Sequence, residues 1–96
     1  MKKFNIGDNV FHLGRNRILS GKIKDGVSSD IYYTIHDGEY IHQVGVGSVY
    51  KTEFEAYQHL VWRSFTIDLD LVEERYPHFH KRMKLQENLK RLKVND

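Results

Sequence analysis

The stretch at residues 4–24 constrains the fold most strongly, because strand-forming and turn-forming residues alternate in it at short intervals. Residues 10–13, Val-Phe-His-Leu, have the β-branched and aromatic character of a strand. Residues 14–17 are polar and turn-like, and residues 18–24 resume as a strand with Gly21 in its interior. A glycine inside a strand commonly marks a bulge or a tight bend. The stretch therefore predicts the entry to a small, strongly bent β-sheet.

Residues 31–44 carry the clearest hairpin signal, since Asp37-Gly38 lies between two runs of β-forming residues. A two-residue turn at Asp37-Gly38 pairs His36 with Glu39. Alternation then assigns one set of side chains to the core face: Ile31, Tyr33, Ile35, Tyr40, His42 and Val44. The outer face receives the other set: Tyr32, Thr34, His36, Glu39, Ile41 and Gln43. A three-residue loop would bring Ile41 to the core face in place of Tyr40, because a slip of one residue flips every side chain.

A fifth strand is expected near Val49-Tyr50, after a bend at Gly45-Val46-Gly47. Five short strands with glycine corners fit a small barrel or a curled antiparallel sheet over residues 4–50. Ile6, the turn pair Gly7-Asp8, Val10 and a strand with an internal glycine resemble the opening of SH3-like small barrels, including the KOW and Tudor types. In that group the barrel is a binding platform whose ligand differs from member to member. The resemblance thus implies a binding module and does not identify its ligand.

The second half of the chain changes to a helical period. Thr52 and Glu55 form a capping box before an apolar helical stripe. The stripe consists of Phe54, Tyr57, Leu60, Val61 and Phe65. Residues 65–71 fit a strand or a helix, and we expect a helix with a break near residues 64–66. The helical segment at 53–76 should pack on the sheet and close one end of its core.

Pro77 separates the last helix from the one before it. It disfavours helical geometry at Tyr76 and is well suited to the first position of a helix over residues 77–93. Tyr76, Phe79 and Met83 lie on one side of that helix, and Leu85, Leu89 and Leu92 lie on another. One straight helix cannot bury both stripes against one small sheet. Either the helix breaks near Lys84, or the leucines meet another surface, or the C-terminus frays, or the leucines fold back onto the first helix.

Composition bounds the class of protein. Ninety-six residues with 40% hydrophobic and 29% charged side chains suit one globular domain, α+β in class, over residues 1–96. The chain has no cysteine, which excludes a disulfide framework and fits a reducing, cytoplasmic setting. No run of about 18 apolar residues is present, so we expect no membrane-spanning helix. No apolar segment follows the basic N-terminal residues, so we also expect no signal peptide.

The net charge of +2 is unevenly distributed along the chain. Residues 1–74 carry eight basic and eleven acidic side chains, and residues 75–96 carry seven basic and two acidic ones. The front of the chain is therefore net acidic, and the last helix is strongly basic. A basic tail attracts nucleic acid or an acidic protein surface, although a solvated helix face has the same composition.

The chain has no glycine-rich phosphate-binding loop, and no local pattern places a nucleophile beside a base. We therefore expect no enzymatic activity and no cofactor. His78 and His80 lie about 200° apart on a helix and cannot share a metal ion from it. His36 and His42 belong to opposite faces of one hairpin. We therefore expect no metal site.

Two sets of residues are candidates for binding. Contacts with a protein partner, or with a second copy in a homodimer through the last helix, are assigned to Tyr32, Ile41, Leu85, Leu89 and Leu92. Contacts with nucleic acid, the alternative, are assigned to Arg15, Arg17, Lys22, Lys24, Lys81, Arg82 and Lys84. The first set is favoured because residues 1–74 are net acidic. The sequence thus predicts a non-enzymatic protein-binding module, of a size that suits a phage or mobile-element accessory protein that inhibits a host factor by occupying it.

Overall fold

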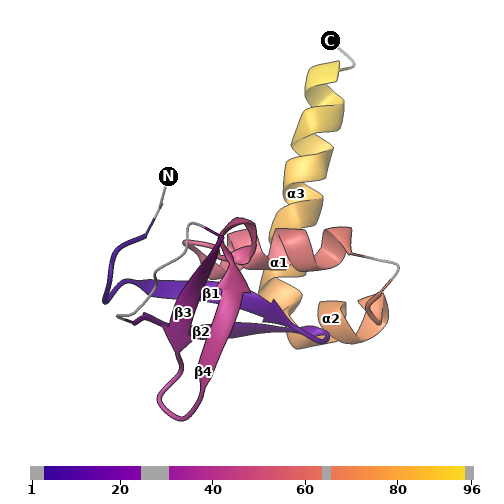
Figure 1. The fold of residues 1–96 in the computed structure, drawn as a ribbon. Helices are drawn as coiled ribbons and strands as arrows, with labels where there is room; N and C mark the ends of the chain where they lie inside the picture. Colours follow the sequence, from indigo (N-terminus) through magenta and orange to yellow (C-terminus); the bar gives the residue numbers. More distant parts are fainter. Residues whose placement is uncertain (1–3, 25–30, 64–65, 95–96) are drawn as a thin grey trace.

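A computed structural model of the chain describes residues 4–24, 31–63 and 66–94, with side chains described as far as Leu89. The fold is α+β, with an antiparallel sheet of four strands in the order β1-β2-β3-β4 and three helices (Figure 1). The strands are β1 (Asn9–Gly14), β2 (Arg17–Ile23), β3 (Tyr32–His36) and β4 (Ile41–Gly45). A short 3₁₀ helix, η1 (Val46–Ser48), precedes α1 (Glu53–Trp62), α2 (Leu69–Arg75) and α3 (Pro77–Val94).

The prediction of a five-stranded sheet is wrong, because the segment expected to form the fifth strand makes only one bridge. Tyr50 pairs with Phe11 of β1 in an isolated antiparallel bridge. Its two backbone hydrogen bonds, at 2.9 and 2.7 Å, join each N–H to the other residue's carbonyl. The 3₁₀ helix η1 ends at Ser48 and Thr52 already caps α1, so too few extended residues remain for a strand.

The β3–β4 hairpin is present, but its turn lies one residue later than predicted. His36 pairs with Ile41 rather than with Glu39. The turn is centred on Gly38 and Glu39, and Gly38 has a φ of 101° that only glycine adopts readily. The register changes by two residues in total, so each strand residue keeps its predicted face. Two residues assigned to the core are exposed instead: Tyr40, which lies at the turn and is 62% exposed, and Ile31, which precedes the first residue of β3 and is 74% exposed.

The first part of the core lies inside the curled sheet. Its buried members are Val10, Ile23, Tyr33, Ile35 and Val49. Gly21 of β2 does not form the predicted bulge, since it pairs directly with Val10 in a continuous register. Its role is close packing instead: a Cβ atom at Gly21 would lie 2.6 Å from Cγ2 of Ile35 and 2.8 Å from the carbonyl oxygen of His36.

The second part of the core joins the helices to the tip of the β1–β2 hairpin. Tyr57, Leu60 and Val72 are buried there. Other side chains pack against them: Leu13, Ile18, Val61, Ile67, Tyr76, Phe79 and Met83. The hydroxyl of Tyr76 accepts a hydrogen bond from the Ile18 N–H at 2.8 Å and so fixes the start of α3 against β2. The helices therefore pack against the sheet at the tip of the β1–β2 hairpin.

The predicted helix boundaries agree with the structure where they can be compared. The Thr52 hydroxyl accepts a hydrogen bond from the Glu55 N–H at 3.1 Å and caps α1. Residues 69–75 are helical, as expected for the ambiguous segment, and Pro77 is the first residue of α3. The predicted break at residues 64–66 and the stripe residue Phe65 fall partly outside the described residues. Among the described helices, none combines the length and apolar character needed to cross a membrane.

Candidate functional site

The C-terminal half of α3 extends away from the rest of the fold. Figure 1 shows α3 rising from the helical layer, with the C-terminus at one end of the molecule and the β3–β4 turn at the other. The principal extents of 50 × 29 × 22 Å reflect this extension. The helix is continuous through Lys84, so the predicted break there does not occur.

Leu85 and Leu89 form an apolar stripe on the exposed part of α3. Their side chains are 62% and 60% exposed, so neither folds back onto α1. On the other side of the helix, Phe79 and Met83 pack against the buried helical core. Leu92 continues the stripe at the i, i+4, i+7 spacing, but its side chain lies outside the described residues. The two predicted stripes therefore lie on one unbroken helix. The stripe with Phe79 and Met83 packs against the helical core, and the stripe with Leu85 and Leu89 does not.

The basic side chains of α3 surround the stripe rather than form a continuous patch. Lys81, Arg82 and Lys84 are exposed. At 100° per residue they spread over about 160° of the helix surface. Arg82 is already engaged, since its guanidinium carbon lies 4.0 Å from the ring centroid of Phe54 in α1. Basic side chains therefore flank the exposed apolar stripe of α3.

The other predicted partner-binding residues, Tyr32 and Ile41, share the outer face of the β3–β4 hairpin at its two ends. Tyr32 pairs with Gly45 and is half-buried, whereas Ile41 pairs with His36 and is 57% exposed. Four residues of strand separate the two pairs, which corresponds to about 13 Å. Because this hairpin and the end of α3 lie at opposite ends of the molecule, the predicted residues form two surfaces (Figure 1).

The basic residues of the first hairpin are not brought together. Arg15 and Arg17 lie at the hairpin tip, next to α2. Lys22 and Lys24 lie at the other end of β2, about 20 Å away at the rise of a strand. All four side chains are exposed. A nucleic-acid interface needs its cations on one face, so this separation gives the alternative function little support.

The tip of the first hairpin is instead tied to α2. Asn16 adopts a φ of 56°, and its side-chain oxygen accepts a hydrogen bond from the Asp68 N–H at 2.8 Å. The Arg75 guanidinium donates to the carbonyl of Asn16 at 2.9 Å. These contacts give the polar tip a structural role, because they fix the position of α2 against the sheet.

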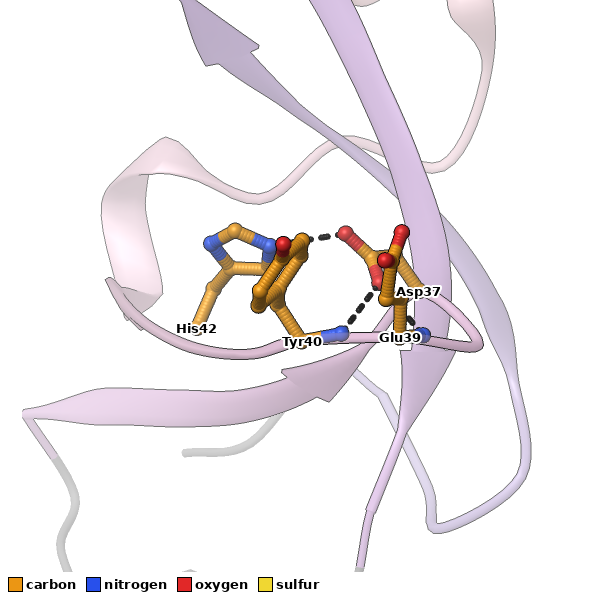
Figure 2. A network of polar contacts seen from close by, with 4 residues as sticks. All are labelled: Asp37, Glu39, Tyr40 and His42. Atoms are coloured by element: carbon orange, nitrogen blue, oxygen red, sulfur yellow. Dashed lines mark hydrogen bonds and ion pairs between the residues drawn. The ribbon is translucent and has the colours of Figure 1, made fainter.

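A polar network fixes the β3–β4 turn (Figure 2). One carboxylate oxygen of Asp37 accepts the backbone N–H groups of Glu39 and Tyr40, at 2.9 and 2.7 Å. The other oxygen lies 2.9 Å from Nε2 of His42. Hydrogen bonds from the Tyr40 backbone and from His42 hold the pKa of the Asp37 carboxyl well below its usual range. The network therefore explains why the turn is centred one residue later than the sequence pattern indicates.

His12 is the one buried polar side chain of the described core, at 3% exposure. Its ring lies 5.3 Å from that of His42, and its Nε2 has no hydrogen-bond partner among the described residues. Burial, and the nearby His42, lower the pKa of His12, while the Asp37 carboxylate acts in the opposite direction. Burial of the ring therefore disfavours the charged imidazolium form of His12 in the folded protein.

Sequence reasoning missed a row of aromatic rings on α1. His59 stacks on Tyr50 with a centroid distance of 4.5 Å and meets the edge of Trp62 at 4.9 Å. Trp62 is 62% exposed, and burial raises the pKa of the Tyr50 hydroxyl. The helical spacing of Trp62, outside the apolar stripe, is the signal that could have identified it as a surface residue.

An open hollow of about 640 Å³ lies on the outer face of the sheet. It is lined by residues of β1, β2 and the start of the β3–β4 turn, including Phe11, Lys22 and His36. Across residues 4–24, 31–63 and 66–94, no group of three or more histidine or acidic side chains is placed to hold a metal ion. The hollow therefore offers a surface that combines aromatic and polar side chains.

Comparison of the chain with protein-family models, curated proteins and solved structures finds no match.

Proposed function

We propose that this protein is a non-enzymatic binding module in which an SH3-like sheet and two short helices hold α3 out for a protein partner. The exposed stripe of Leu85 and Leu89 supports this proposal most directly. Large apolar side chains clustered on a helix face, with basic residues around them, are typical of a surface that packs against another helix.

The size of the stripe sets the strength of the expected contact. Full burial of a leucine contributes about 1.5–3 kcal/mol, so Leu85 and Leu89 together contribute about 3–6 kcal/mol. The loss of rotational and translational freedom on association costs about 4–15 kcal/mol. The two leucines alone are therefore too few, and the partner has to add further contacts along α3. A contact of this kind suits a reversible interaction.

Charge indicates what the partner looks like. Residues 75–96 carry a net charge of +5, from seven basic and two acidic residues. Two copies of α3 packed in parallel would place these like charges side by side, whereas an acidic amphipathic helix would complement them. The partner that fits best is thus an acidic amphipathic helix of another protein. This module would bind that helix through α3. A homodimer through α3 is the competing arrangement.

A binding experiment with designed peptides tests the proposal. The probe is a labelled amphipathic helix with leucines at i, i+4 and i+7 and glutamates beside them, compared with the same helix carrying lysines. The full chain should bind the acidic probe, and Leu85→Ser/Leu89→Ser should lose at least tenfold in affinity. Glu87→Gln, on the side of α3 opposite the leucines, is the matched control and should retain binding to within about threefold.

Two further measurements separate the competing functions. Sedimentation of the full chain and of Leu85→Ser/Leu89→Ser shows whether α3 mediates self-association. Anisotropy with a labelled oligonucleotide at two salt concentrations tests nucleic-acid binding, which weakens steeply as salt rises. The proposal fails if the acidic probe does not bind, or if it binds the leucine variant as tightly as the parent chain.

A further inference from the structure

The backbone hydrogen bonds of the β3–β4 hairpin define which side of β4 is free. The N–H of Asp37 donates to the carbonyl of Tyr40 at 3.1 Å, next to the turn. At the other end, the N–H of Val46 donates to the carbonyl of Ile31 at 2.9 Å. Hydrogen-bonded pairs recur at every second residue of an antiparallel ladder. The two bonds fit a single ladder, because they are separated by an even number of residues on each strand.

The same parity assigns each residue of β4 to one side. His42 and Val44 direct their backbone N–H and carbonyl groups toward β3, where they pair with Ile35 and Tyr33. The intervening residues direct theirs away from the sheet: Ile41, Gln43 and Gly45. These three residues are exposed, and no described strand pairs with this side of β4, which is the last strand in the sheet order.

This edge lacks the features that usually prevent strands from pairing between molecules. Edge strands are commonly protected by lysine, by proline or by a bulge. None of these occurs in Ile41–Gly45, whose sequence is Ile-His-Gln-Val-Gly and whose pairing with β3 is continuous. Ile41 adds an apolar side chain that is 57% exposed beside the free backbone groups.

We infer that the outer edge of β4 pairs antiparallel with the β4 edge of a second copy of this chain, about a two-fold axis at Gln43. In this register Gln43 lies opposite Gln43 of the second copy. Ile41 lies opposite Gly45 of the second copy, and the reverse holds by symmetry. All three pairs have their backbone groups pointing at one another, so they form about six hydrogen bonds. Because Ile41 and Gly45 lie at equal distances from Gln43 along the strand, this edge is complementary to itself in the two-fold register.

The side chains permit this register. The isoleucine at each end faces a glycine, which leaves room for it, and two neutral amides meet at the centre. His42 faces Val44 of the second copy, so no like charges are opposed within the strand. Each four-stranded sheet would thereby continue into that of the other copy. The β3–β4 turn lies at an end of the molecule, away from α3, which leaves the edge accessible (Figure 1).

The contact is expected to be modest in strength. Stable interfaces bury about 1,200–2,000 Å² in total, and a pairing of five-residue strands provides less than that. A concentration-dependent equilibrium between monomer and dimer is therefore the expected behaviour. This inference does not depend on the proposed function, because it uses no residue of α3.

Complementary charges at the two-fold axis provide the test. Gln43→Lys places two lysines opposite each other, and Gln43→Glu places two glutamates there. Like charges directly opposite destabilise a strand pair, so each variant alone should dimerise roughly fivefold or more weakly than the parent chain. An equimolar mixture of the two should recover dimers, because lysine then faces glutamate. Sedimentation equilibrium over a wide concentration range measures all three constants.

Amide hydrogen exchange supplies a second readout that does not require a variant. Exchange at Gln43 should slow as the concentration of the parent chain rises, while exchange at the exposed Glu39 of the turn should not. Leu85→Ser/Leu89→Ser, in α3, is the matched control and should dimerise like the parent chain.

Several results would overturn the inference. A parent chain that remains monomeric at all concentrations contradicts it, and so does a dimer that both Gln43 variants leave intact. If the mixture of the two Gln43 variants stays monomeric while the parent chain dimerises, the symmetric register is wrong. A dimer lost in the leucine variant and kept in the Gln43 variants would transfer the interface to α3, in agreement with the competing arrangement under the proposed function.

Discussion

The substitution Gly21→Ala tests the close packing of β2 against β3. A Cβ atom at this position would lie 2.6 Å from Cγ2 of Ile35 and 2.8 Å from the carbonyl oxygen of His36. Ordinary carbon contacts are longer by about 1 Å. Ile35 is fully buried, and the carbonyl oxygen belongs to the backbone of the neighbouring strand. Neither atom has a free direction in which to retreat, so the two strands must separate.

The magnitude follows from two opposing terms. Overpacking of a well-packed interior costs about 1–3 kcal/mol, and contact with backbone places this site in the upper part of that range. Replacing glycine by alanine lowers the entropy of the unfolded chain and returns about 0.4–1 kcal/mol. The free energy of unfolding should therefore fall by about 2 kcal/mol. For a domain of this size, that loss lowers the melting temperature by about 8–16 °C.

Urea unfolding followed by circular dichroism measures the effect, with Gly47→Ala as the matched control. At Gly47 no atom lies within 4 Å of the added Cβ, so only the entropy term remains and the control should gain about 0.4–1 kcal/mol. If Gly21→Ala were as stable as the parent chain, or if both variants lost the same free energy, the close approach of β2 and β3 would be refuted.

Three further predictions concern single side chains. Tyr57→Phe should raise the free energy of unfolding by about 1 kcal/mol in urea titration, since its buried hydroxyl has no described partner; a clear loss would contradict this. Thr52→Ala should lower that energy by about 1 kcal/mol through loss of the α1 cap, with Thr52→Ser, which keeps the capping hydroxyl, as its control. Because burial lowers the pKa of His12, the unfolded chain binds more protons below about pH 6.5, and stability should fall from pH 7.5 to 5.5. His12→Leu should flatten this profile, and an equal slope in both proteins would refute the assignment.

Much of the secondary structure was predictable because it depends on neighbours in the sequence. Thr52 caps the helix that follows it through a hydrogen bond three residues away, and Pro77 starts the next one. The faces of the paired residues in β3 and β4 were also correct, since strand alternation has a period of two and the error in the register was two residues. The turn itself was misplaced, because the carboxylate of Asp37 forms a network with His42 that the pattern does not reveal.

The candidate binding surfaces likewise include one that the sequence predicted and one that only the structure showed. The helical period identified Leu85 and Leu89 as a stripe separate from Phe79 and Met83. In the structure Phe79 and Met83 pack against the helical core, whereas Leu85 and Leu89 are exposed. The sequence pattern did not show whether the outer side of β4 pairs with another strand. Whether an edge is free depends on the order of strands in the sheet, which places β4 at one edge and β1, the strand that Tyr50 bridges, at the other.

The sequence by itself determined the local elements of this protein: a hairpin at Asp37-Gly38, a capped helix after Thr52, and a two-sided helix after Pro77. Signals of this kind act within a few residues and need no tertiary partner. The tertiary structure alone decided that Tyr50 makes one bridge, that Gly21 serves close packing, and that β4 is the last strand of the described sheet. Such features depend on which distant segments share the limited space around one small core, and a pattern read along the chain does not contain that information.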